Sequence, residues 1–398
     1  MDGIKRFIVV KQKIIRQELL ELVQAGLFPV RNARIIPHGA PVDWEKVYQL
    51  AREQSVQGLV LQGLEELRAK GLELSAPKML LLQWIGEVQV IEQRNKAMNS
   101  FVADLFGKLQ EAGIDAVLVK GQGIAQCYEK PLWRSSGDVD LLLDAENYEK
   151  AKELLLSQAT DVETEYTHFK HLGMSIGGFT VELHGTMHTR LSARVDSMVD
   201  EVQKEVFNGG KVRLVEFKSS SGSRVQVALP APDEDVIFVF THILHHFFFE
   251  GIGLRQICDW CRLLYTYRDA LNHKLLESRL RKAGLMTEWK TFAAFAVEYL
   301  GMPADAMPLY PSAAQGGQEF KKFKWKADKI CKFVLEVGNF GHKQRRDYSG
   351  MSYVTRKFVS FWGRLSDMLR HFRIFPLDSI LFFSGVLRSG LHAAVRGE

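Results

Sequence analysis

Two aspartates stand one residue apart at the start of an apolar run, in the stretch 134-RSSGDVDLLL-143. Side chains at i and i+2 of a strand point to one face, so Asp138 and Asp140 should converge while Val139 faces the other side. Two close carboxylates repel each other, and a divalent cation relieves that repulsion. Oxygen ligands of this kind suit Mg²⁺ or Mn²⁺, with substrate phosphates completing the shell. The pair alone predicts either a metal site or a set of solvated charges.

A glycine-rich turn precedes this strand. The stretch 117-VLVKGQG-123 has the pattern of a strand that runs through Lys120 into a turn and then a helix. Such a turn can present backbone N–H groups and a helix N-terminus to a phosphate, with the lysine adding positive charge. The alternative is a plain connection between a strand and a helix.

A third carboxylate follows in 180-TVELHG-185, where Glu182 interrupts an apolar strand. Three acids on neighbouring strands beside a glycine turn form the pattern of a two-metal phosphoryl-transfer site. His184 lies two residues after Glu182 and therefore on the same face of the strand. It either contacts substrate or metal or is a structural histidine, and the same alternatives hold for His168 and His171, which are expected in a loop.

The order of these elements resembles the nucleotidyltransferase superfamily that includes DNA polymerase beta. Within it, three stretches are similar to a bacterial group called the uncharacterised nucleotidyltransferase family: 119-VKGQGIAQCYEKPLWRSSGDVDLLL-143, 181-VELH-184 and 253-GLRQICDW-260. The resemblance extends from about Asp43 to the C-terminal tail. It implies transfer of a nucleoside monophosphate from an NTP to an acceptor hydroxyl, with release of pyrophosphate and two Mg²⁺ (or Mn²⁺) ions as cofactors.

The resemblance also implies roles for individual residues. Asp138 and Asp140 would hold the two metals, and Glu182 would bind the second metal and help to deprotonate the attacking hydroxyl. The metals and Lys120 would stabilise charge on the α-phosphate. The residues expected to bind nucleotide or phosphate are Lys120, Gly121, Gln122, Gly123, Arg134 and Gly137, with Arg134 alternatively bracing the carboxylates.

Helical segments farther along the chain supply more candidates. His242 and His246 have the HxxxH spacing of zinc ligands, but no glutamate follows His242 as it would in HExxH, so the pattern favours a helix that lines the cleft or packs its histidines. Arg255 and Asp259 are i,i+4 partners that either pair or place Arg255 on a phosphate. Cys258 and Cys261 have CxxC spacing without a second pair, which favours buried structural thiols.

The surrounding pattern predicts an α+β fold, in which a small mixed sheet forms the nucleotidyltransferase core between N- and C-terminal helical regions. Amphipathic periodicity indicates one helix over 43–71, with Asp43 as N-cap, and another from about 77 to 112. Strands are expected at 114–121, 138–143, 174–185, 211–217 and 224–230, and helices at 122–129, 146–158, 233–248 and 254–267. The predicted regions are 1–112 (helical), 113–230 (α/β core), 231–300 (helices lining the cleft) and 301–398 (a loop and basic amphipathic helices).

Composition is ordinary for a globular protein: 398 residues, 46% hydrophobic and 25% charged, with four cysteines and a net charge of +5. We expect two or three domains, no transmembrane segment and a reducing, cytoplasmic location. Residues 341–398 carry ten Lys or Arg against four Asp or Glu. This basic, aromatic-rich tail either packs on the body or contacts nucleic acid or a membrane surface.

Two other functions therefore stay open beside the enzyme. One is a non-catalytic nucleotide-binding or regulatory module with the same fold. The other is a nucleic-acid-binding protein that acts through the basic C-terminal region. The acceptor class is open as well, because a small molecule, a sugar, a protein or an RNA end all suit the same chemistry.

Overall fold

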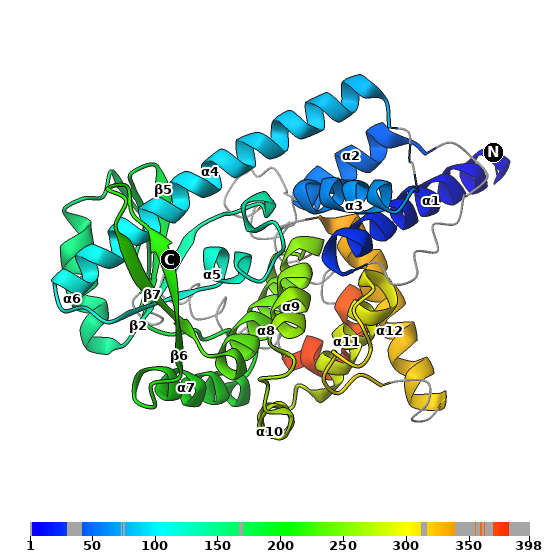
Figure 1. The fold of residues 1–398 in the computed structure, drawn as a ribbon. Coiled ribbons are helices and arrows are strands. Elements are labelled where there is room, and N and C mark those ends of the chain that lie inside the picture. Colours follow the sequence, from blue (N-terminus) through cyan, green and yellow to red (C-terminus); the bar gives the residue numbers. More distant parts are fainter. Residues whose placement is uncertain are drawn as a thin grey trace.

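The structure is a computed structural model that describes residues 2–29, 42–72, 74, 76–166, 170–311, 317–338, 355, 359, 362 and 369–381. In these ranges the element order is α1 (Asp2–Leu27), α2 (Trp44–Glu53), α3 (Gln57–Ala69), α4 (Lys78–Glu111), β1 (Ala116–Val119), α5 (Gly121–Ala125), η1 (Pro131–Trp133), β2 (Val139–Leu143), α6 (Ala145–Leu156), β3 (Asp161–Val162), β4 (His171–Ile176), β5 (Phe179–His184), α7 (Ala193–Phe207), β6 (Val212–Lys218), β7 (Arg224–Pro230), α8 (Pro232–Phe249), α9 (Leu254–Tyr267), α10 (His273–Ala283), α11 (Met286–Leu300) and α12 (Gly317–Val337). The predicted α+β class, a small mixed sheet flanked by helices, is confirmed (Figure 1).

The central sheet has five strands in the order β1-β2-β5-β4-β3. Strands β2 and β5 run parallel, and the other neighbouring strands run antiparallel. The glycines Gly177 and Gly178 both have positive φ and form the turn between β4 and β5, as the sequence predicted. Strands β6 and β7 form a separate antiparallel hairpin.

The two faces of the sheet differ in chemistry because side chains alternate along each strand. On one face the odd-numbered residues of β2 and β5 join a hydrophobic cluster with α4, α6 and the β6–β7 hairpin; among them are Val139, Leu141, Leu143, Val181 and Leu183. The opposite face carries Asp140, Glu182 and His184. The predicted alternation of Asp140 against Val139 and Leu141 is therefore observed.

A second hydrophobic cluster joins α1–α3 with α8, α9, α11 and α12, so helices from both ends of the described chain share one core. Helix α4 contributes to both clusters, with Trp84 and Val88 in this one and Met98 and Phe106 in the cluster under the sheet. Figure 1 shows α4 running from the sheet to the neighbourhood of α2 and α3. It is the longest helix among the described residues, and it connects the helical core to the sheet.

The single helix predicted for 43–71 is wrong, because the chain breaks between α2 and α3. Ser55 adopts a positive φ of 55° at the break. The fully buried Gln54 side chain donates to the carbonyl of Val334 (2.9 Å) and accepts from the N–H of Leu254 (2.8 Å). These tertiary hydrogen bonds satisfy a buried amide, and they outweigh the local helical periodicity. Asp43 stands at the N-cap position of α2, but its carboxylate makes no side-chain capping bond.

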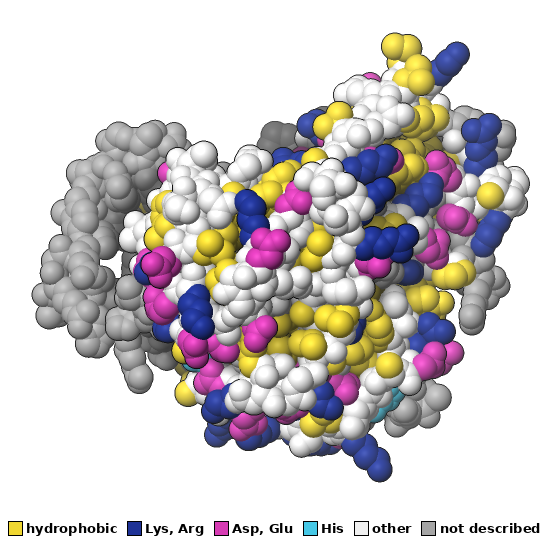
Figure 2. All heavy atoms as spheres, turned by 60° about the vertical axis from the view of Figure 1, so that its left-hand side comes forward, with side chains coloured by type: hydrophobic (Ala, Val, Ile, Leu, Met, Phe, Trp, Pro, Cys, Tyr) yellow, Lys and Arg dark blue, Asp and Glu magenta, His cyan; other side chains and the backbone are white. Residues whose placement is uncertain are grey.

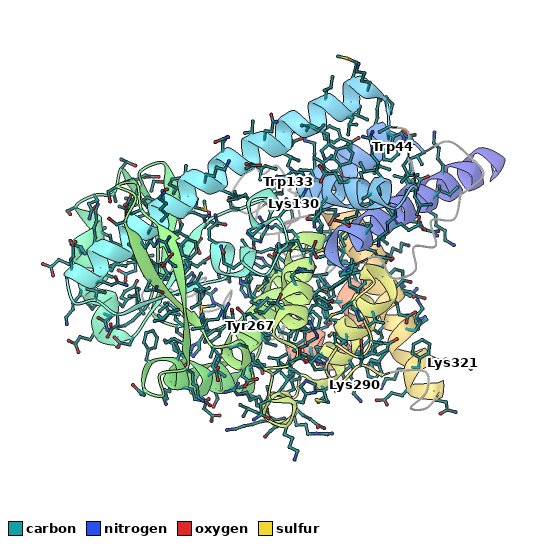
Figure 3. The ribbon with its side chains drawn as sticks, in the orientation of Figure 1. Trp44, Lys130, Trp133, Tyr267, Lys290 and Lys321 are labelled. Carbon is teal, nitrogen blue, oxygen red and sulfur yellow. The ribbon has the colours of Figure 1, made fainter. Side chains whose placement is uncertain are left out.

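Helix α5 is also shorter than the expected 122–129, and the chain then turns through η1 toward Asp138. This approach is fixed by α4, since the Asn95 amide donates to the carbonyls of Leu132 (2.8 Å) and Arg134 (2.7 Å). The Trp133 indole donates to Glu92 of the same helix, and Lys130 lies over the Trp133 ring (Figure 3). The backbone that leads into the DVD strand is thus held from outside the sheet.

The molecular surface bears on the alternative of a basic binding face. On the face in Figure 2, lysine and arginine side chains are interspersed with aspartate and glutamate. The prediction for the basic tail falls mostly outside the described residues, apart from positions 355, 359, 362 and 369–381. Among the helices that the structure describes, none has the length and apolar character needed to cross a membrane.

Helices α1 and α3 approach so closely that only glycine fits between them. A Cβ atom at Gly63 would lie 2.1 Å from the carbonyl oxygen of Leu22. We expect Gly63→Ala to destabilise the protein by about 1–3 kcal/mol, because the backbones must separate to admit the methyl group. Thermal and urea unfolding would measure the change.

The matched control is Gly86→Ala, since no atom lies within 4 Å of the corresponding Cβ position in α4. That change should be neutral or stabilise the helix by about 1 kcal/mol. Equal effects at the two glycines would contradict the close approach.

Candidate active site

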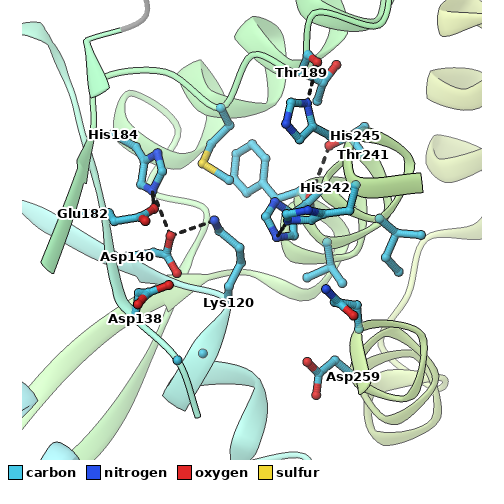
Figure 4. Close-up of a pocket in the computed structure, with 18 of the residues that line it drawn as sticks. Lys120, Asp138, Asp140, Glu182, His184, Thr189, Thr241, His242, His245 and Asp259 are labelled. Carbon is cyan, nitrogen blue, oxygen red and sulfur yellow. Dashed lines mark hydrogen bonds and ion pairs between the residues drawn. The ribbon is translucent and has the colours of Figure 1, made fainter. Parts of the chain in front are cut away.

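A cavity of about 510 Å³ lies between the polar face of the sheet and helices α8 and α9 (Figure 4). Its lining comes from the turn after β1, the start of β2, strands β4 and β5, the loop 186–190, and the sides of α8 and α9 that face the sheet. The cavity therefore lies where residues distant in sequence meet.

The three predicted acids converge on this cavity (Figure 4). Parallel pairing of β2 with β5 puts Asp140 directly beside Glu182. Asp138 immediately precedes β2 and is exposed, whereas Asp140 retains 7% of its accessible surface. Two of the acids come from the strands and one from the backbone that α4 holds in place.

The carboxylates perturb one another. Partial burial and the negative charges of Glu182 and Asp140 raise the pKa of Asp138 to about 6, although Asp138 lies at the exposed edge of the group. Burial opposes ionisation of Glu182 too, but hydrogen bonds to His171 and His184 outweigh it and hold its pKa well below the usual range. At neutral pH the site therefore holds several negative charges in a small volume.

Lys120 supplies nearby positive charge. Its ammonium lies 2.7 Å from Asp140 Oδ1. Burial opposes that charge, but the attraction of Asp140 and Glu182 prevails and raises the pKa of Lys120. The backbone of Lys120 has φ 59° and ψ −146°, a strained conformation for a residue with a Cβ. Gly121 follows with φ 38°, so the predicted Lys-Gly turn places the ammonium on the acids at a cost in backbone energy.

Two histidines connect the acids on the β4–β5 side. His184 Nε2 lies 2.8 Å from Asp140 Oδ1 and 3.3 Å from Glu182 Oε2. His171 Nε2 lies 3.3 Å from the same Glu182 oxygen. Burial opposes protonation of His184, but its hydrogen bonds to Asp140 and Glu182 raise its pKa. His171 begins β4 rather than lying in a loop, and His168 lies outside the described residues.

Arg134 and Asp259 form a buried pair that lines the cavity. The guanidinium donates to both carboxylate oxygens of Asp259 at 2.7 Å, and the Tyr128 hydroxyl donates to Oδ1 at 2.8 Å. Burial opposes the charge on Arg134, but Asp259 outweighs it and raises the pKa of the guanidinium. Asp259 is thus hydrogen-bonded to Arg134 rather than to the i,i+4 neighbour Arg255 that the sequence had suggested. A bidentate pair of this kind braces the wall of the cavity.

Arg255 also lines the cavity and donates to the carbonyl of Ser135 at 3.1 Å. Burial and the charge of Arg134 lower the pKa of Arg255 to about 10, so it still carries its charge at neutral pH. It faces the start of β2 from the helical wall, with its positive charge attracted to Asp138.

The remaining turn residues divide into two groups. Gly121 and Gly137 line the cavity. Gln122 and Gly123 are not among the described residues that line it: the Gln122 amide donates to Asn95 and Asn99 of α4, and a Cβ at Gly123 would lie 2.4 Å from Leu229. Contact of these two residues with phosphate stays a prediction, because the Gln122 amide is hydrogen-bonded to α4 and Gly123 packs closely against Leu229.

Helix α8 forms the wall opposite the acids. His242 lines the cavity, and its Nε2 lies 2.9 Å from Nε2 of His246. Burial and the charge of Lys120 lower the pKa of His242 well below its usual value, so its ring is neutral. His245 Nδ1 donates to the carbonyl of Thr189 (2.9 Å). Cys258 and Cys261 are free and buried in the helical core.

Sequence reasoning did not anticipate the loop 186–190. Thr189, Arg190 and Glu250 are further described residues that line the cavity. The polar run 186-TMHTR-190 directly after the strand that carries Glu182 is the signal that could have indicated this loop. Glu250 and Thr241 lie on or beside α8, where the surrounding apolar residues conceal any polar pattern.

These features define an α+β protein whose mixed sheet brings three carboxylates, a lysine and two histidines to one cavity. The chain belongs to the uncharacterised nucleotidyltransferase family, whose family model matches residues 40–301. The matched range contains the sheet, the cavity and helices α8–α11, so the resemblance expected from the KGQG and DVD motifs is confirmed. No curated protein and no solved structure matches the chain.

The raised pKa of Asp138 predicts a pH-dependent stability in metal-free buffer. Its folded-state pKa of about 6 exceeds the ordinary 3.8, so ionised Asp138 destabilises the folded state above about pH 6, and this penalty disappears as the pH falls below about 4. We expect Asp138→Asn to raise the thermal midpoint at pH 7.5 with EDTA and to have no such effect near pH 4.

Asp305→Asn is the control, because Asp305 is an exposed carboxylate in the loop after α11. Its substitution should leave the midpoint unchanged at both pH values. A lower midpoint for Asp138→Asn at pH 7.5 would show that the carboxylate is stabilised rather than repelled where it lies.

Proposed function

We propose that this protein is a metal-dependent nucleotidyltransferase that moves a nucleoside monophosphate from an NTP to an acceptor hydroxyl. The acceptor oxygen would form a bond to the α-phosphorus, the bond to the bridging oxygen would break, and pyrophosphate would leave. The observation that carries the proposal is the convergence of Asp138, Asp140 and Glu182 with Lys120 at one cavity. Membership of the nucleotidyltransferase family supports the same reaction class.

The donor set suits divalent cations. Three carboxylates line one cavity, and burial together with the negative charges of Glu182 and Asp140 raises the pKa of Asp138. Cations of charge +2 relieve such repulsion, and carboxylate oxygens are the ligands that Mg²⁺ and Mn²⁺ prefer. Asp138, Asp140 and Glu182 would hold two ions. When bound, these ions would neutralise charge on the phosphates and lower the pKa of the attacking hydroxyl.

The protein's own cations would orient the nucleotide. Lys120 presents an ammonium on the floor of the cavity, and Arg255 presents a charged guanidinium from α9. A triphosphate placed between them would lie across the acids with its charge compensated on both sides. The cavity of about 510 Å³ has the size range of nucleotide-sized ligand pockets.

Glu182 keeps the role that the resemblance implies, which is to bind the second metal and help to deprotonate the acceptor hydroxyl. The raised pKa of Asp138 belongs to the metal-free site, because its causes are burial and the negative charges of Glu182 and Asp140. Bound cations would relieve that repulsion, so the pKa of the metal-free site does not select Asp138 as the base.

The test follows pyrophosphate release from ATP, CTP, GTP and UTP with Mg²⁺ or Mn²⁺. Acceptors would be supplied as separate pools of small molecules, sugars, RNA and protein, with labelled α-phosphate to trace the product. Removal of a metal-binding carboxylate withdraws several kcal/mol of transition-state stabilisation, so Asp140→Asn should lower the rate on the order of a thousandfold.

Asp161→Asn is the control, since Asp161 lies in β3 at the far edge of the same sheet. It should retain the wild-type rate, and circular dichroism should show that both variants are folded. Metal-dependent NTP binding without transfer to any pool would instead support the non-catalytic nucleotide-binding module. Absence of both binding and transfer would exclude the proposed function.

A further inference from the structure

The β4–β5 edge of the cavity holds two histidines that the three-acid scheme does not use, and both lie beside Glu182. His171, Glu182 and His184 each direct one potential ligand atom into the same small volume, and these atoms all lie within 4.8 Å of one another. No other group of three histidine, cysteine or acidic side chains meets this condition in the part of the chain that the structure describes. The group of His171, Glu182 and His184 contains two imidazoles, which a plain magnesium site does not need.

Strand geometry brings the three residues together. Glu182 and His184 occupy alternate positions of β5 and therefore share its polar face. Antiparallel pairing places His171 of β4 directly opposite His184, and the two rings lie with centroids 4.8 Å apart. The group is thus built from two adjacent, hydrogen-bonded strands rather than from a loop, which is the more rigid kind of support for ligands.

Two distances within the group are close to those between ligands of one metal ion. Both imidazole Nε2 atoms lie 3.3 Å from the same oxygen, Glu182 Oε2. Charge-assisted hydrogen bonds between nitrogen and carboxylate are usually shorter, at about 2.7–2.9 Å. Ligand atoms bound tetrahedrally at about 2.1 Å from a metal ion lie about 3.4 Å from one another. These two separations therefore match edges of a coordination shell.

We propose that His171 and His184, together with Glu182 from the three-acid set, form a site for a divalent transition-metal ion of the Co²⁺ and Zn²⁺ class. Its two imidazole ligands distinguish it from the Mg²⁺ ligands Asp138 and Asp140. Imidazole nitrogen suits ions of this class and is a poor ligand for Mg²⁺, which prefers oxygen. The inference deepens the proposed function and rests on it for what the bound ion would serve.

The surroundings allow the ion to enter and connect it to the acids. The side chains of His171 and Glu182 are each 26% exposed, and all three residues line the cavity. His184 Nε2 also contacts Asp140 Oδ1 at 2.8 Å. Metal binding through His184 Nε2 would replace this hydrogen bond, and the bound ion would lie within reach of the negative charge of Asp140.

Direct metal binding tests the proposal without nucleotide or turnover. The full chain would be stripped with EDTA, desalted and titrated with CoCl₂ while the visible absorption of Co²⁺ is followed, and ZnCl₂ would then be added as a competitor. We expect one Co²⁺ per chain with the absorption of a site containing nitrogen ligands, displaced by Zn²⁺. His171→Ala should weaken the binding of both ions. The loss should be at least roughly 10- to 100-fold, which is what removal of an outer-shell partner already costs.

Three further variants sharpen the result. His273→Ala removes an exposed histidine at the start of α10 and should bind Co²⁺ as the wild type does. His171→Gln keeps a polar side chain in case the alanine variant is unstable, and it should also lose affinity. Asp138→Asn should weaken the binding of Mg²⁺ and leave the visible absorption of bound Co²⁺ unchanged.

Two results would overturn the inference: equal Co²⁺ affinity in the wild type and both His171 variants, or no Co²⁺ binding by the wild type. The outcomes are separable from those of the transfer assay. Nucleotidyl transfer with Mg²⁺ in the absence of Co²⁺ binding would leave the proposed function intact and remove the histidine site. Co²⁺ binding through His171 in a protein that transfers no nucleotide would do the reverse.

Discussion

Negative charge gathered on one face of a small sheet is the constraint around which the rest of the cavity is arranged. Parallel pairing of β2 and β5 places Asp140 beside Glu182, and Asp138 adds a third carboxylate at the end of the same row. Such a group is tolerated in a partly buried place only if cations or hydrogen-bond donors surround it. Lys120 and His184 meet Asp140, and His171 and His184 meet Glu182. The pKa of Asp138 stays raised, because burial and the negative charges of Glu182 and Asp140 outweigh the attraction of Lys120 and Arg255.

Each of the compensating side chains is positioned by a different local feature of the chain. Lys120 is aimed at Asp140 by a turn with a strained backbone, and the histidines are aimed by strand register. The approach to Asp138 is held by Asn95 of α4. Arg134, which precedes the acids in sequence, is hydrogen-bonded to Asp259 instead and braces the helical wall. Positive charge near the acids thus separates into groups that touch them and groups that shape the space around them.

Much of this arrangement could be predicted from the sequence, because it rests on short-range rules. Alternation in a strand predicts that Asp140 shares a face with Asp138, and the same rule pairs Glu182 with His184. What failed were features decided by tertiary contacts. The break at Ser55 exists because Gln54 bonds Val334 and Leu254, which are some 200 or more positions away. The partner of Asp259 was missed for the same reason, since Arg134 is far from it in sequence. The roles of the individual residues in chemistry remain predictions, because no geometric rule assigns a ligand to a site.

The long helix α4 joins the two sides of the cavity. The acids lie on the sheet, whose opposite face packs on one hydrophobic cluster. The wall formed by α8 and α9 belongs to the other cluster, the helical core. With 34 residues, α4 spans about 50 Å and is embedded in both. The width of the cavity is therefore the distance between two packed clusters that α4 joins. A molecule wider than the cavity would enter only if α4 bent or if one cluster moved along it. The helix therefore limits the size of the molecules that can enter the cavity.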